Sequence, residues 1–108
     1  MTKAIFVSLT NPVSSERDAE YNGWFNGTHG PEVVALDGIR KLTRYRANVN
    51  VVPGGEPVHQ YLAVYEIDDV DTALKAMGEA APNFTMSDSL DFGTMSGVVF
   101  EKIFTLDK

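Results

Sequence analysis

Residues 20–33 read EYNGWFNGTHGPEV, and this stretch predicts how the rest of the chain is organised. Its large side chains recur every three or four positions, which is typical of the inward face of a helix. The members of this row are Tyr21, Trp24, Phe25, Thr28 and His29. Serines upstream offer an N-cap, so we expect a helix over about 16–29. Pro31 suits the first position of a separate short helix that ends near residue 36.

Further stretches of the sequence predict a four-stranded sheet and a second main helix. The expected strands are 3–9, 39–48, 58–67 and 96–105. The expected helix covers 70–81, whereas 83–95 shows no period and is expected to be a loop. The order βαββαβ predicts an α+β, ferredoxin-like fold in which an antiparallel sheet carries both main helices on one face. We expect all of residues 1–108 to form one domain.

The composition excludes several classes of function. The net charge of −6 argues against a general nucleic-acid-binding surface, which needs clustered basic residues. The absence of cysteine removes disulfides, thiolate metal sites and cysteine nucleophiles. No apolar stretch approaches the ~20 residues that span a bilayer. We therefore expect a soluble, cytoplasmic protein with no membrane partner, no metal and no cofactor.

Apolar residues occur on both faces of two expected strands. Ile5, Phe6 and Val7 are consecutive in the first strand, and Val98, Val99 and Phe100 are consecutive in the last. Successive strand residues point to opposite faces, so both faces of the sheet carry apolar side chains. The helices cover one face, and we expect another subunit to cover the second.

The segments 20–26, 29–33, 36–39 and 44–45 together resemble EthD-like members of the dimeric α+β barrel superfamily. The shared features are an aromatic-rich first helix, a His-x-Pro at its end, a Leu-Pro-Gly-like turn and an Arg-Tyr pair in the second strand. The turn here is Leu36-Asp37-Gly38, so its middle residue departs from the usual proline. The resemblance implies a homodimer in which two sheets pack face to face, and a mostly apolar cavity between the helices and the sheet of each subunit.

His29 is the strongest candidate for a catalytic group, because an imidazole exchanges protons near neutral pH. Asn22 or Tyr65 would position a carbonyl or hydroxyl group of the substrate. The residues expected to bind a hydrophobic small molecule are Tyr21, Trp24, Phe25, Tyr61 and Arg44. The alternative for the aromatic row is a simple core, as is usual for such rows, and the alternative for His29 is a capping or packing role at the helix end. His59 lies near the expected hairpin loop and is expected to be exposed.

Residues 40–46 hold four of the nine basic residues of this acidic chain. Strand alternation predicts that Arg40, Arg44 and Arg46 share one face with Leu42. The opposite face would carry Ile39, Thr43 and Tyr45. The basic cluster either recognises an anionic substrate or pairs with carboxylates across the sheet or the dimer. The sequence leaves both interpretations open.

These features favour a small, cofactor-independent enzyme that acts on an aromatic or polyketide-like molecule. Proton transfer by His29 next to a carbonyl would support cyclisation, isomerisation or elimination, as in a lyase, an isomerase or a polyketide cyclase of aromatic compound metabolism. One alternative is a cofactor-free monooxygenase of the same superfamily. Another is a non-catalytic ligand-binding or accessory protein of an oxidation pathway.

Overall fold

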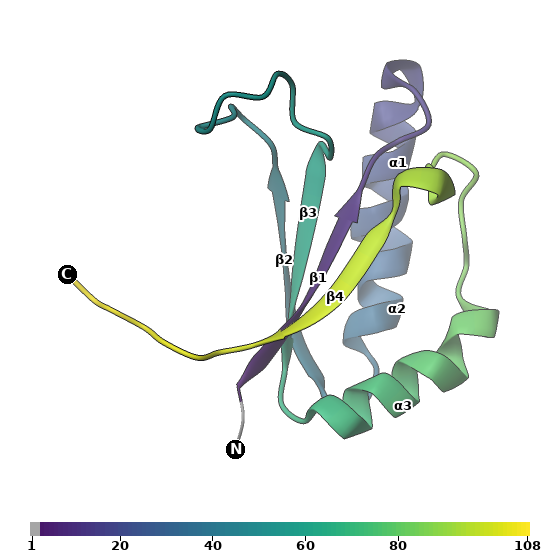
Figure 1. Cartoon of the computed structure of the whole chain (residues 1–108). Helices are drawn as coiled ribbons and strands as arrows, with labels where there is room; N and C mark the ends of the chain where they lie inside the picture. The colour runs from purple at the N-terminus through teal and green to yellow at the C-terminus, as the bar shows by residue number, and fades with distance from the viewer. Residues whose placement is uncertain (1–2) are drawn as a thin grey trace.

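A computed structural model describes residues 3–108, so residues 1 and 2 of the expected single domain lie outside the described part. Four strands form one antiparallel sheet in the order β2-β3-β1-β4. They are β1 (Ala4–Thr10), β2 (Ile39–Arg46), β3 (Tyr61–Ile67) and β4 (Ser96–Glu101). The helices α1 (Asp18–Trp24), α2 (Gly30–Val34) and α3 (Val70–Ala80) lie on one side of it (Figure 1). The expected βαββαβ ferredoxin-like fold is confirmed.

Three strands are shorter than expected because their partners end first. β4 stops at Glu101, which pairs with Ala4 at the start of β1. β2 stops at Arg46 because β3 begins only at Tyr61. Just before β3, the carbonyl of Gln60 still accepts from the amide of Ala47 at 2.8 Å, but the amide of Gln60 donates to the side chain of Asn11 at 2.8 Å.

The first helix is continuous, and the expected break before Pro31 is wrong. A π-helical turn, η2 (Phe25–His29), joins α1 directly to α2, and the amide of Gly30 donates to the carbonyl of Phe25 five residues earlier. In a regular α-helix the proline ring would crowd a carbonyl of the preceding turn. The wider π turn accommodates the proline without ending the helix.

The continuous helix packs closely on the sheet at Gly30. A Cβ atom there would lie 2.7 Å from Cδ2 of Leu42 and 2.8 Å from the carbonyl oxygen of Phe25. The neighbouring core is aromatic: Tyr21, Phe25 and Tyr65 are at most 1% exposed. This close packing fixes the side chains of η2 relative to those of β3.

A β-bulge near the start of β2 changes which basic residues share a face. Ile39 pairs with Ile67 and Lys41 with Glu66, so Arg40 is an extra residue between them. Ile39 consequently joins the buried, helix-facing side, and Arg40 lies on the opposite side. The expectation that Arg40 shares a face with Arg44 and Arg46 is wrong, as is the expectation that Ile39 lies with Thr43 and Tyr45. The two later arginines remain on the helix-facing side with Leu42.

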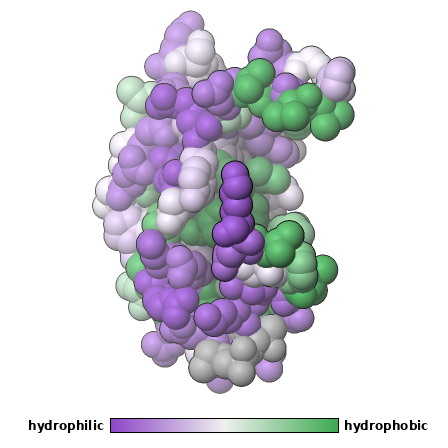
Figure 2. Space-filling view, turned by 90° about the vertical axis from the view of Figure 1, so that its left-hand side faces the viewer, coloured by the Kyte–Doolittle hydropathy of each residue, from purple (hydrophilic) through white to green (hydrophobic). Residues whose placement is uncertain are grey.

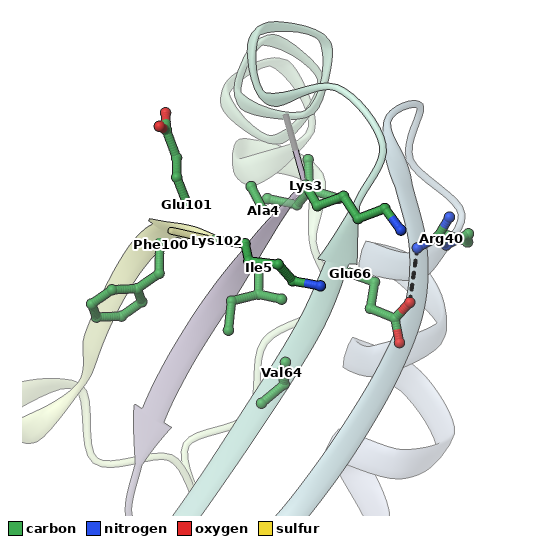
Figure 3. Close-up of a pocket in the computed structure, with 10 residues that line it drawn as sticks. Lys3, Ala4, Ile5, Arg40, Val64, Glu66, Phe100, Glu101 and Lys102 are labelled. Carbon is green, nitrogen blue, oxygen red and sulfur yellow. Dashed lines mark hydrogen bonds and ion pairs between the residues drawn. The ribbon is translucent and has the colours of Figure 1, made fainter. Parts of the chain in front are cut away.

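The sheet face away from the helices is apolar in its centre and is open in the described chain. Alternation along three neighbouring strands places on it Ile5, Val7, Leu9, Leu62, Val64, Val98 and Phe100. Figure 2 views the molecule from this side and shows hydrophobic surface in its middle, partly covered by hydrophilic side chains, with further hydrophobic groups at its right-hand margin. Figure 3 shows Ile5, Val64 and Phe100 on adjacent strands, with the Arg40–Glu66 ion pair at the edge.

Candidate functional site

A cavity of about 400 Å³ lies between the helices and the sheet. Its walls are mostly apolar and come from β1, the first helix, β3, α3 and the segment that follows α3. Four of the residues expected at the site line it: Trp24, Phe25, His29 and Tyr65. The sequence analysis therefore predicted one wall of this cavity, which is formed by the helix over 18–34 and by Tyr65 in the middle of β3.

Aromatic rings surround His29. Its imidazole stacks on the indole of Trp24, with ring centroids 4.8 Å apart and planes inclined by 17°. Phe25 and Phe84 meet the imidazole edge to face at 5.0 and 5.6 Å. The stacking with Trp24 depends on the π turn, which brings residues five apart onto nearly the same face of the helix. His29 is thus held in one orientation at the cavity wall.

The surroundings of His29 favour its neutral form. Burial among aromatic rings lowers the pKa of the imidazole from its ordinary value of 6.5, and the nearby carboxylate of Glu32 opposes this effect. Glu32 itself accepts hydrogen bonds from the amide and the hydroxyl of Thr85, both at 3.0 Å. His29 Nδ1 is buried and has no hydrogen-bond partner among the described residues.

Tyr65 lines the same cavity and carries a second unpaired polar atom. Its side chain is 1% exposed, and its ring stacks on Phe6 at 5.5 Å. The hydroxyl has no hydrogen-bond partner in the described part of the chain. Burial raises the pKa of this phenol well above its ordinary value, so Tyr65 keeps its proton at neutral pH. It can donate a hydrogen bond to an oxygen in the cavity.

Asn22, Tyr61 and Arg44 lie together, but away from His29. The amide of Asn22 donates to the Tyr61 hydroxyl at 3.0 Å and accepts from Arg44 Nη1 at 3.0 Å. None of the three lines the cavity of His29. The expected cooperation of Asn22 with His29 around one substrate is therefore not supported by their placement. Tyr21 is fully buried between the two groups, with its hydroxyl bonded to both Thr10 and Arg44.

The remaining cavity wall was missed by the sequence analysis. It consists largely of apolar residues from the end of α3 and from the segment expected to be a structureless loop, including Met77, Phe84, Met86, Leu90 and Met95. Three of the four methionines of the chain are among them. Composition could have indicated this wall. The 13 residues of 83–95 show neither helical nor strand periodicity, yet they include five large apolar side chains.

His59, the other histidine, has a structural role. Its Nε2 lies 2.6 Å from the carbonyl oxygen of Thr94 and so ties the segment before β3 to the segment before β4. No group of three histidine, aspartate or glutamate side chains in residues 3–108 is arranged to hold a metal ion. Within the same residues, no helix is long and apolar enough to cross a membrane.

Known structures share the fold of this chain, although no protein-family model and no curated protein matches its sequence. An EthD (ethyl tert-butyl ether D) family protein from Bacillus halodurans has a TM-score of 0.61 at 17% identity, over 95% of this chain and 100% of that one. An EthD-like protein from Ralstonia eutropha has a TM-score of 0.58 at 14% identity, over 100% and 97%. HapK from Hahella chejuensis has a TM-score of 0.53 at 13% identity, over 100% and 98%. The chain therefore has the fold of EthD family proteins, as its resemblance to them predicts.

Proposed function

We propose that the protein binds an aromatic or polyketide-like molecule in the helix–sheet cavity and moves a proton on it through His29. The observation that carries this proposal is the pair of buried, unpaired polar atoms, His29 Nδ1 and the Tyr65 hydroxyl, on two residues that line one apolar cavity. A buried polar group without a partner costs about 1–3 kcal/mol, so it calls for an explanation. A ligand that accepts a hydrogen bond from the Tyr65 hydroxyl, or donates one to His29 Nδ1, would explain why these atoms have no partner in the chain.

The protonation states of the two groups are complementary. His29 has a lowered pKa and stays neutral at pH 7, so its ring can accept a proton. Tyr65 has a raised pKa and stays protonated, so its hydroxyl can stabilise a developing negative charge on oxygen. A base and a hydrogen-bond donor in one cavity are the equipment for removing a proton next to a carbonyl. Isomerisation, cyclisation and elimination all begin with that step.

The lining supports an aromatic or polyketide-like substrate. Trp24, Phe25 and Phe84 provide ring surfaces around His29, and three methionines provide flexible apolar contacts that adapt to irregular shapes. Few polar groups interrupt this surface, which is usual for sites that bind small apolar molecules. A strongly charged substrate would find no charged partner among the residues that line the cavity.

We propose further that two copies of the chain pack through the open face of the sheet. Phe100 is 51% exposed and Val98 is 45% exposed on this face, next to apolar residues of β1 and β3. Charged side chains such as Arg40, Glu66 and Lys102 surround it (Figure 3). An apolar centre with a polar rim is the usual arrangement of a protein–protein interface. A second copy offers the same surface and so completes a symmetric contact.

The lowered pKa of His29 predicts a pH-dependent stability. The pKa of His29 is lower in the folded chain than its ordinary value, which applies to the unfolded chain. At pH values between the two, the unfolded chain binds a proton at His29 more readily than the folded chain does. The wild type should therefore lose more free energy of unfolding than His29→Gln when the pH falls from about 7.5 to about 5.5. Urea unfolding at the two pH values measures this difference. A loss that is equal in both proteins would contradict the burial of His29.

Proton transfer is testable without knowledge of the natural substrate. The wild type should accelerate deuterium uptake beside the carbonyl of α-tetralone in heavy water. His29→Gln and Tyr65→Phe should each lower the enzymatic rate by roughly 10²-fold. The matched control is His59→Gln, because His59 lies outside the cavity and should leave the rate unchanged. Fluorescence of Trp24, the single tryptophan, reports binding separately from exchange. Full exchange activity in a folded His29→Gln variant would exclude His29 as the base.

The proposed dimer predicts a sedimentation mass of about twice the 11.8 kDa of the chain at micromolar concentration. Phe100→Glu places a charge on the open face, at the edge strand β4, and should give the monomer mass without unfolding the chain. Val13→Glu is the control, since Val13 is 47% exposed but lies in the segment after β1. A monomer mass for the wild type, or a dimer that persists in Phe100→Glu, would refute the proposed interface.

A further inference from the structure

A second hollow, of about 450 Å³, lies between the first helix and the edge strand β2. It shares no lining residue with the cavity of His29. Its polar lining residues are Asp18, Asn22, Asn26, Arg44, Arg46 and Tyr61. The first three come from the helix, and the others come from β2 and β3. This hollow therefore collects the residues that the sequence analysis grouped with His29 but that the fold separates from it.

Arg44 is held at this hollow entirely by neutral groups. Its Nη1 donates to the amide oxygens of Asn22 at 3.0 Å and Asn26 at 2.8 Å, and its Nη2 donates to the Tyr21 hydroxyl at 3.3 Å. Its guanidinium also lies 4.2 Å from the centre of the Phe25 ring. No carboxylate of residues 3–108 forms an ion pair with Arg44. The guanidinium is thus fixed in place while its charge remains unbalanced.

The one carboxylate in the hollow is already engaged by neutral donors. Asp18 accepts from the Tyr61 hydroxyl at 2.5 Å and from the Asn22 amide at 3.2 Å. Arg46 is exposed and forms no ion pair within the described residues. Two guanidinium groups against one carboxylate leave a single unbalanced positive charge, in a protein whose net charge is −6. A half-enclosed hollow with this charge attracts an anion.

The donors of the hollow suit a carboxylate. The Asn26 oxygen accepts from Arg44, and its amide nitrogen, which has no hydrogen-bond partner within residues 3–108, can donate to a ligand beside the two guanidinium groups. The exposed guanidinium of Arg46 can bind a carboxylate through paired hydrogen bonds, while Arg44, whose Nη1 already donates to Asn22 and Asn26, contributes its charge. A phosphate dianion would add a second negative charge next to Asp18, and that repulsion disfavours it. We propose that this hollow is a binding site for a small monocarboxylate, separate from the site of the proposed proton transfer.

Butyrate and its neutral analogue butyramide test this proposal as a matched pair. Titration of the wild type, followed by backbone amide shifts, should show saturable binding of butyrate at residues of the hollow and about tenfold weaker binding of butyramide. Added salt should weaken butyrate binding, because the attraction is between charges near the surface. The reaction of His29 is not involved, so the result is independent of the exchange experiment.

Arg46→Gln should weaken butyrate binding by about fivefold or more, since it removes one charge from an exposed position where folding is not at risk. Arg40→Gln is the control: Arg40 lies on the same strand but on the open face, paired with Glu66 at 2.9 Å (Figure 3) and with Asp68 at 3.0 Å. Equal affinity for butyrate and butyramide would overturn the proposal. An equal loss of butyrate affinity in Arg46→Gln and Arg40→Gln would overturn it too. Tighter binding of inorganic phosphate than of butyrate would overturn the assignment to a carboxylate.

Discussion

The position of every candidate group depends on how one helix crosses the sheet. Pro31 has no amide hydrogen and would crowd a regular α-helix, and Gly30 is the point of close contact with Leu42. The helix accommodates both residues without a break because it widens into the π turn over Phe25–His29. That turn places the imidazole of His29 on the indole of Trp24, at the wall of the cavity. A break in the helix at this point would have left His29 at a flexible end.

Phe25 separates two chemically different sites on the same helix. Its ring meets His29 edge to face at 5.0 Å, and its face lies 4.2 Å from the Arg44 guanidinium. One is an apolar cavity lined by His29, whose pKa is lowered by burial, and by Tyr65, whose pKa is raised by burial. The other is polar and carries an unbalanced positive charge. The buried rings of Phe25 and Tyr21 keep the arginine charge out of the apolar cavity, where a charge would be costly.

The topology was predictable because periodicity and turn residues act locally. In β3 the alternation from Tyr61 to Ile67 separates a buried face, which carries Tyr65, from a partly exposed one. Two features were not predicted because each changes the spacing at which side chains return to the same face. The bulge at Arg40 reverses the face of the residues before it, and the π turn shifts the helical phase at His29. Neither a one-residue bulge nor a π turn leaves a pattern in a single sequence.

The candidate site was predictable only in part, for a related reason. Tyr65 comes from a regular strand, so its face followed from alternation, whereas His29 lies in the π turn and was placed only by its spacing from Phe25. Asn22 is three residues from Phe25, yet it joins Arg44 because the edge strand offers it a charged partner. Phe84 and Met86 reach the cavity from a segment without a period, and its path is set by tertiary contacts such as the bond of Thr85 to Glu32. Such contacts are not encoded in local spacing.

The central claim is that His29 and Tyr65 form the polar end of a ligand cavity. The most direct measurement is the ¹⁵N shift of the His29 ring nitrogens during titration with 2-naphthol, an aromatic hydroxyl compound. The account predicts a saturable shift of Nδ1 as it accepts a hydrogen bond from the hydroxyl group, together with a change in Trp24 fluorescence. Ring nitrogens that do not respond while 2-naphthol saturates other residues would contradict it.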